Sequence, residues 1–280
     1  MNGSEWAPAL FGLASAATWG AGDFCGGFAT RRTNVYGVIL VGDLVGGVLL
    51  AGLALGFGET LPRWNEMLVG GAAGLSGAVG LIALYRALAL GRMSVASPVA
   101  AVVSGALPAV LGTFVDGLPG LGRGIGFGLA LLGVWLVSSN ERARIQWSQL
   151  GLPVVAGLGF GVFFILIDGV SQTAVFWPLV GARLAAVAAL GAFGTATRQL
   201  QRPAVEHLPL MALVGVLDAG GNAFFALAAR AGRLDVAAVL SSLYPATTVW
   251  LAWLILKERI GRWQTVGILV VLTAIVLISF

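Results

Sequence analysis

The segment AGRLDVAAV (residues 231–239) aligns with LGRMSVASP (residues 90–98) when the chain is shifted by 141 positions against itself. Without gaps, the same shift carries residues 12–139 onto residues 153–280. The matched pairs include Gly20 and Gly161, Gly74 and Gly215, Gly80 and Gly221, Arg92 and Arg233, and Gly126 and Gly267. Self-similarity in one constant register indicates an internal duplication. We therefore expect two related units, residues 1–141 and residues 142–280.

The composition is that of a membrane protein. The chain is 58% hydrophobic and only 10% charged, whereas a soluble domain carries about 25% charged residues, and its mean hydropathy is +0.95. A helix needs about 20 apolar residues to cross a bilayer. Ten such runs follow one another, at residues 7–29, 35–57, 66–89, 94–115, 121–139, 149–168, 174–197, 208–229, 235–256 and 262–280. We expect an all-α polytopic protein of the plasma or inner cell membrane, built as one membrane domain over residues 1–280.

The number of runs also predicts the topology. Each unit holds five runs, and an odd number means that the second unit enters the membrane inverted relative to the first. Two inverted five-helix repeats suit alternating access, in which one bundle rocks against the other around a central cavity at the midplane.

Several classes of protein are disfavoured. One cysteine and one histidine are too few for protein-ligated zinc or haem. The sequence contains neither a P-loop nor a His-Glu-x-x-His motif. The net charge of +4 lies between apolar runs, as topology-setting charge does, and is no nucleic-acid patch. We expect no cofactor, no metal, no nucleic-acid partner and no enzymatic activity.

The stretch GVLDAGGNAFF (residues 215–225) carries an acid and an amide near the middle of an apolar run. Asp218 and Asn222 are four residues apart, so they share one helix face. A charge in hydrocarbon costs about 2.5–3.5 kcal/mol on insertion scales. This pair is expected either to line a wet cavity, where Asp218 is a candidate for proton coupling, or to bond a neighbouring helix as a purely structural element.

A second pair of opposite charges approaches the midplane from two other runs. Asp43 lies about seven residues inside the second run and Arg183 about eight inside the seventh, at about 1.5 Å per residue. They are expected to form an ion pair or gate. The alternative is two separate side chains that extend to the membrane surface.

The first run brings Trp19 and Asp23 onto one face with Ser15. An aromatic ring beside an acid is a candidate cradle for an amine or another cation. The alternative for Trp19 is anchoring at the membrane interface, where tryptophan is enriched.

Hydroxyl groups next to prolines form the last set of candidate cavity residues. Ser97 lies in the fourth run, and Ser241, Ser242 and Tyr244 lie at the related place in the ninth. A proline frees a backbone carbonyl, and these hydroxyls can satisfy either that carbonyl or a ligand. A kink with only backbone partners is the alternative.

The C-terminal stretch SSLYPATTVWLAWLILKERIGRWQTVGILVVLTAIVLIS (residues 241–279), together with SAATWGAGDF (residues 15–24), resembles the EamA-like ten-helix members of the drug/metabolite transporter superfamily. The positions that match the family pattern are Ser242, Pro245, Leu256, Glu258, Arg259 and Gly267. Lys257 replaces the usual glycine. In the first half, Asp116 and Gly117 stand where the acidic-basic turn would be, and Ser104 stands where the second half has Pro245.

The resemblance implies a secondary transporter of a small metabolite in a lipid bilayer, with proton-coupled export as one form and a homodimer as an open option. A channel, a structural membrane protein and an intramembrane enzyme are the alternatives. Orientation also stays open. The distribution of arginine and lysine favours both termini outside, whereas the resemblance implies both termini in the cytoplasm.

Overall fold

The computed structural model describes residues 6–89, 93–115, 120–138, 150–200, 203–256 and 261–279. Within these ranges the chain is helical and contains no strand. The elements are α1 (Ala7–Thr30), α2 (Val35–Gly56), α3 (Trp64–Ala89), α4 (Met93–Val115), α5 (Leu121–Ser138), α6 (Gly151–Ser171), α7 (Phe176–Ala196), η2 (Val205–His207), α8 (Leu208–Ala231), α9 (Leu234–Ser241), α10 (Tyr244–Leu256) and α11 (Arg262–Ser279). The unit boundary expected at residues 141 and 142 lies outside the described residues, as do Asp116, Gly117, Lys257, Glu258 and Arg259.

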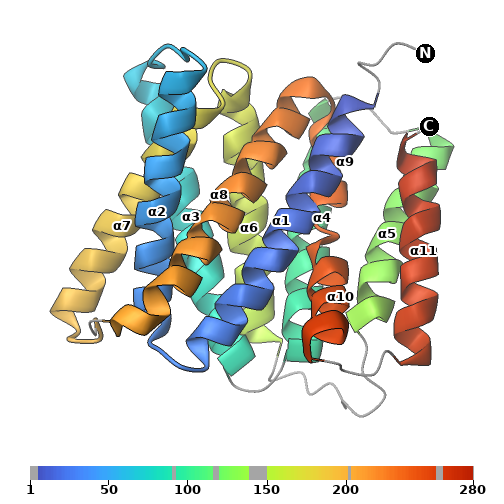
Figure 1. Ribbon diagram of the computed structural model, residues 1–280. Coiled ribbons are helices and arrows are strands. Elements are labelled where there is room, and N and C mark those ends of the chain that lie inside the picture. The colour runs from blue at the N-terminus through green and yellow to red at the C-terminus, as the bar shows by residue number, and fades with distance from the viewer. Residues whose placement is uncertain are drawn as a thin grey trace.

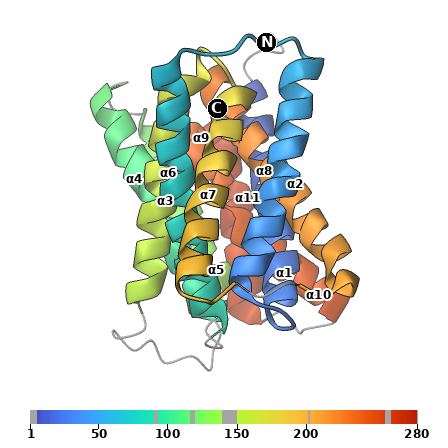
Figure 2. The ribbon, with the colours of Figure 1, turned by 90° about the vertical axis from the view of Figure 1, so that its left-hand side faces the viewer.

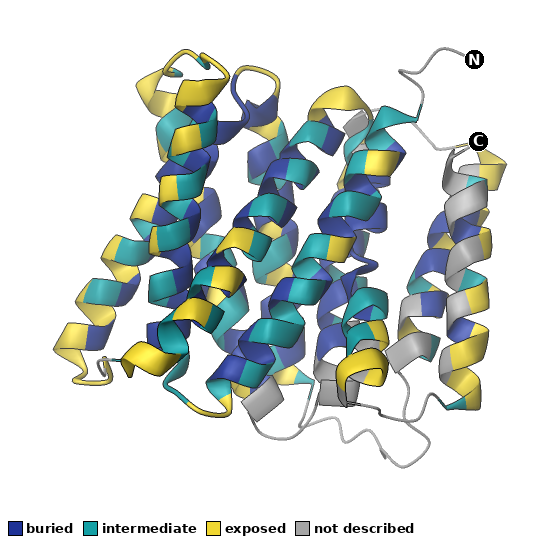
Figure 3. Cartoon of the chain, viewed as in Figure 1, coloured by how far each residue is buried: buried dark blue, intermediate teal, exposed yellow. Residues whose placement is uncertain are grey.

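Six helical stretches of the described part are long and apolar enough to cross a membrane: Val35–Gly56, Trp64–Ala87, Gly151–Ser171, Phe176–Ala196, Val205–Ala231 and Leu234–Ile255. Large apolar side chains such as Val48, Phe114 and Leu184 lie exposed on the outside, and Figure 3 shows exposed positions along the outer helices and buried ones between them. Apolar surface on this scale is typical of contact with lipid. The predicted all-helical membrane protein is confirmed at this level.

The ninth apolar run is confirmed as one candidate membrane span, Leu234–Ile255, and a short break divides it into two helices. α9 ends at Ser241 and α10 begins at Tyr244. Pro245 has no amide hydrogen to donate to a carbonyl in the preceding turn, and its ring clashes there. The Ser242 hydroxyl donates to the Val239 carbonyl oxygen at 2.8 Å, which satisfies one acceptor at the end of α9.

The helices α2 and α7 lie side by side and run in opposite directions (Figures 1 and 2). At one end of the pair, the loop after α2 meets the start of α7, where the Glu59 carboxylate accepts from the Phe176 amide at 2.8 Å. At the other end, the Asn34 side-chain amide donates to the Gln199 carbonyl oxygen at 3.0 Å. The helices α5 and α11 form a separate pair at one edge of the bundle (Figure 1).

The remaining packing follows the register of the sequence repeat. α1 packs on α8 and α6 on α3, while α2 packs on α8 and α7 on α3. Two glycines that are 141 positions apart lie at these crossings. A Cβ atom on Gly74 would overlap the backbone of Ala182 in α7, and one on Gly215 would overlap the backbone of Gly42 in α2. Glycine is required at both positions because it alone allows such close approach.

We predict that Gly74→Ala and Gly215→Ala each destabilise the protein by about 1–3 kcal/mol, because the added methyl group forces two backbones apart. Gly191→Ala is the matched control, since a Cβ atom there meets nothing within 4 Å. Thermal unfolding in detergent measures the difference. Equal melting temperatures for all three variants would contradict the close approach.

Candidate functional site

A cavity of about 70 Å³ lies between α1, α2, α3, α6, α7, α8 and α10, and a volume of this size holds several water molecules. Seven of the eleven residues proposed from the sequence line it: Trp19, Asp23, Asp43, Arg183, Asp218, Asn222 and Tyr244. α3 and α6 supply an apolar part of the wall: Gly74, Gly77, Ala78, Leu81, Phe160, Phe163 and Phe164.

Arg183 is the centre of the charged part of the wall. Its Nη1 atom forms an ion pair with Asp43 Oδ1 at 2.5 Å, and its Nη2 atom forms an ion pair with Asp218 Oδ2. The ion pair that was expected between Asp43 and Arg183 is therefore confirmed, and Asp218 joins it from a third helix. One guanidinium thus connects α7 to both α2 and α8.

Because the cluster is buried, the stability of each charged side chain depends on its partners. The side chains of Arg183 and Asp43 are 9% and 4% exposed, whereas Asp218 is 23% exposed. Removal of one partner from a buried pair costs about 3–5 kcal/mol, because a charge stays behind without compensation. The arginine packs beside two glycines of α2: Cβ atoms on Gly46 and Gly47 would lie 3.6 Å from its Nε and 3.4 Å from its Cβ, which is ordinary van der Waals contact.

The carboxylates of the cluster keep further hydrogen-bonding capacity. Asn222 donates from Nδ2 to Asp218 Oδ2 at 3.4 Å, one helical turn along the same face of α8. Asp43 Oδ2 is buried and has no hydrogen-bond partner among the described residues. Buried acceptors are normally paired, so this oxygen is an exception among the described residues.

Asp23 differs from the two paired acids. It lines the same cavity and is only partly buried, and it forms no hydrogen bond or ion pair with any described residue. Its neighbour Gly22 packs against α8 at Leu217 and Asp218, so two acids face one another across the α1–α8 contact. No group of three or more His, Cys, Asp or Glu suited to a metal ion occurs in the described part of the chain.

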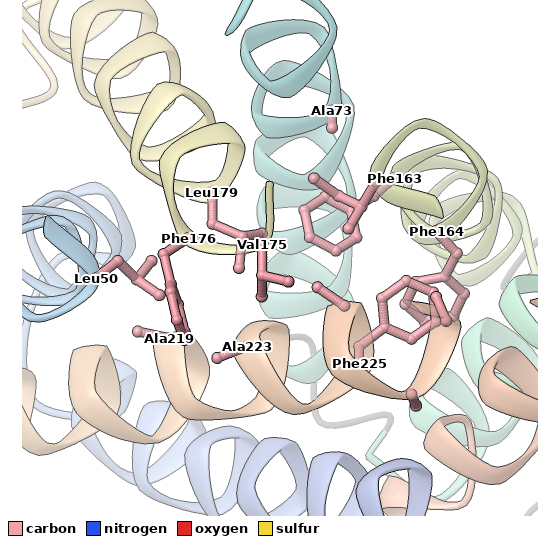
Figure 4. Close-up of a cluster of buried hydrophobic side chains, with 14 of the residues drawn as sticks. Leu50, Ala73, Phe163, Phe164, Val175, Phe176, Leu179, Ala219, Ala223 and Phe225 are labelled. Carbon is pink, nitrogen blue, oxygen red and sulfur yellow. The ribbon is translucent and has the colours of Figure 1, made fainter. Parts of the chain in front are cut away.

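Aromatic rings form one side of the cavity. Trp19 stacks on Phe164 with ring centroids 5.4 Å apart, and on Phe225 at 6.0 Å. Phe164 and Phe225 stack at 4.5 Å, and Figure 4 shows them approaching from two different helices. Trp19 therefore belongs to an aromatic cluster inside the bundle. It does not act as an anchor at the membrane interface, which was the alternative. A Cβ atom on Gly221 would overlap the indole ring, so this glycine makes space for it.

The four serines proposed from the sequence do not line the cavity as the described residues define it. Ser15 donates to the Gly221 carbonyl oxygen at 2.8 Å, and Ser241 donates to the Gly12 carbonyl oxygen at 3.5 Å. Ser242 bonds within α9, as described above. Ser97 is buried, and its carbonyl oxygen accepts from the Tyr244 hydroxyl at 3.4 Å. The hydroxyls of Ser15 and Ser241 thus link α1 to α8 and to α9, and Tyr244 is the member of this set that faces the cavity.

Two polar contacts lie beyond the cavity, one toward each end of the bundle. At one end, the Glu59 carboxylate accepts from the amides of Val175, Phe176 and Trp177, and the Trp177 indole donates to the Glu59 carbonyl oxygen at 2.9 Å. At the other end, Arg86 donates to the Tyr36 hydroxyl. The sequence analysis missed these residues because nothing near them along the chain identifies their partners.

The apolar wall was also missed. Phe160, Phe163 and Phe164 lie in a run that reads as ordinary packing, and composition does not separate a ring that faces a cavity from one that faces lipid. The repeat carried a usable signal, because Phe160 stands 141 positions after Trp19 and Phe164 stands 141 positions after Asp23.

Two of three comparisons with known proteins found a similar family or structure. Residues 147–280 match the EamA-like transporter family. A solved structure described only as "Crystal structure of protein" is similar over 96% of this chain and 95% of that chain, with a TM-score of 0.80 at 13% identity, which shows a shared fold. No curated protein matches the chain in sequence.

We predict strong thermodynamic coupling between Asp43 and Arg183. Asp43→Asn and Arg183→Gln should each destabilise the protein, and the double variant should lose less than the sum, with a coupling energy of at least about 1 kcal/mol. Thermal unfolding in detergent gives all four stabilities. Glu206→Gln with His207→Gln is the control cycle, because that pair is 3.6 Å apart with Glu206 exposed, and exposed pairs contribute little. Additive effects at Asp43 and Arg183 would contradict the ion pair.

Proposed function

We propose that the chain belongs to the EamA-like transporter family, which its residues 147–280 match, and that it is a secondary transporter that moves a small metabolite by alternating access around the central cavity. The observation that carries this proposal is the cluster of Asp43, Arg183 and Asp218 inside an apolar bundle. Ionisable groups within a membrane are costly, and as a rule they serve a solute or ion pathway. We further propose that this membrane is the cell membrane.

The architecture that we propose is two inverted five-helix repeats with ten membrane spans, over residues 1–141 and 142–280. Its support is the correspondence of contacts under the 141-residue shift. Gly221 makes space for the ring of Trp19, and Gly80 makes space for the ring of Phe160 in the corresponding place. The corresponding helices α2 and α7 run in opposite directions, which an inverted pair requires.

The cluster is suited to a moving part because it joins helices of both proposed repeats. Arg183 comes from the second repeat, and it holds Asp43 of the first and Asp218 of the second. A relative rotation of the repeats changes the Arg183–Asp43 contact directly. The polar contacts at Glu59 and at Tyr36 and Arg86 lie toward opposite ends, as two alternating gates would.

Proton coupling is a further part of the proposal. Asp218 is the most exposed member of the cluster and lines the cavity. Release of its contact with Arg183 frees a carboxylate that can take a proton, and the same step loosens the link between α7 and α8. Export driven by the inward proton gradient is the direction that we propose.

A channel is the second candidate, because inverted repeats also occur in channels. The contacts toward both ends of the cavity favour a transporter, since a channel needs one continuous open path. Counterflow in proteoliposomes separates the two: a transporter accelerates uptake of labelled solute when unlabelled solute is inside, and a channel does not. The solute for this assay comes from a thermal-shift screen of amino acids, nucleosides, amines and sugar phosphates.

We predict that equivalent loop positions of the two repeats label from opposite sides of the membrane. Arg63 and Ala204 are 141 positions apart, and both are exposed. Arg63→Cys and Ala204→Cys, each in a Cys25→Ser background, should react with a membrane-impermeant maleimide from opposite faces of right-side-out vesicles. Detergent-solubilised protein, in which both sites react, is the control. Labelling of both from one face would overturn the inverted repeat.

We predict that Asp218→Asn abolishes the dependence of flux on a pH gradient and lowers the driven rate at least about tenfold. The amide keeps the size of the carboxyl group. It has no acidic proton to exchange and no negative charge to pair with Arg183. Flux of the solute found in the screen is measured in proteoliposomes with and without the gradient. Glu206→Gln, which removes an exposed acid outside the cavity, should leave both unchanged. An unaltered pH dependence in Asp218→Asn would exclude this residue from coupling.

A further inference from the structure

The charges of the cavity do not balance. Three carboxylates line it, from Asp23, Asp43 and Asp218, against the single guanidinium of Arg183. Asp43 and Asp218 both bind that guanidinium, and Asp23 has no hydrogen-bond or ion-pair partner among the described residues. A carboxylate in a low-dielectric site needs a cation or a proton beside it. The described residues supply no cation to Asp23, which is therefore left to bind a proton or a cation that enters the cavity.

The arginine is already neutralised. Its two terminal nitrogens each form an ion pair with a carboxylate, one from α2 and one from α8. An anionic solute would meet three carboxylates in this cavity beside the guanidinium, and like charges at close range repel one another. The cavity is therefore less suited to carboxylate and phosphate solutes, although it contains an arginine.

The shift that relates the two repeats shows that the cavity has two chemically different sides. Asp23 corresponds to Phe164, Asp218 corresponds to Gly77, and the Asn222 position corresponds to Leu81. Each of these six residues lines the cavity. The acids and the amide lie on α1 and α8, whereas their counterparts on α6 and α3 are apolar. A related scaffold thus presents charge on one side and an aromatic surface on the other.

We propose, on the basis of the transporter function above, that the cavity binds a small organic cation with a flat apolar group, whose ammonium pairs with Asp23 and whose apolar part lies against Phe160 and Phe164. The Trp19 ring lies one helical turn from Asp23 on α1 and extends the aromatic surface on which the apolar group would lie. The side-chain carbonyl oxygen of Asn222, which lines the same cavity, can accept one of the remaining ammonium hydrogens.

Three probes of one shape test the proposal: phenethylamine, which is a cation at neutral pH, 2-phenylethanol, which is neutral, and 3-phenylpropanoate, which is an anion. Binding to the purified full chain in detergent is followed by isothermal titration calorimetry. We expect phenethylamine to bind at least about tenfold more tightly than either analogue, since a charged hydrogen bond is stronger than a neutral one. Equal or tighter binding of the neutral or anionic probe, or binding of none of the three, would overturn the proposal.

Two substitutions of Asp23 test whether this residue causes the preference for the cation. Asp23→Asn should remove the preference for phenethylamine over 2-phenylethanol, and Asp23→Glu, which restores the charge, should retain it. Asp23→Asn is isosteric and breaks no hydrogen bond or ion pair with a described residue, and a monodisperse elution profile checks its fold. Retention of the preference in Asp23→Asn would overturn the assignment, as would its loss in the distant control Glu206→Gln.

The substrate class and the transport function fail in different ways. Selective binding of phenethylamine without counterflow in proteoliposomes supports the cation site and contradicts the transporter. Counterflow of another solute without selective binding of phenethylamine supports the transporter and contradicts the cation site.

Discussion

The structure depends on one constraint: a guanidinium inside an apolar bundle must be neutralised by groups from other helices. Arg183 meets it with Asp43 and Asp218, so α2, α7 and α8 are fixed around one point. Lipid supplies no competing hydrogen bonds at this depth, which makes the cluster far more specific than apolar packing. The helices can slide past one another only by breaking these contacts together.

Glycine provides the complementary constraint at the apolar crossings. Where Gly74 meets α7 and Gly215 meets α2, backbones touch without side chains between them. Helices in a bilayer gain little from burying leucine, because lipid is equally apolar, and they gain from close packing. The same device makes room for large rings, since Gly221 accommodates Trp19 and Gly80 accommodates Phe160. Small residues on one helix thus determine where the aromatic residues of another can stand.

The helices could be predicted from the sequence, but the contacts between them could not. Hydropathy gave the runs that became α1 to α8 and α11, because a membrane helix is defined by local composition. The ninth run was predictable as a span, and Pro245 marks the break inside it. The Asp43–Arg183 pair was predictable from depth alone, whereas the contact of Arg183 with Asp218 depends on which helices touch. Residue type alone did not decide whether the serines face the cavity or the backbone, and the hydroxyls of Ser15 and Ser241 bond backbone carbonyls of other helices.

The contacts at the two ends of the α2–α7 pair are unequal in strength. Glu59 gathers three amides at the start of α7, where the helix dipole adds to the attraction, whereas Asn34 and Gln199 share a single exposed hydrogen bond. This asymmetry makes the Glu59 end the more firmly held point in any relative movement of α2 and α7, because the Asn34 end separates with the loss of a single hydrogen bond.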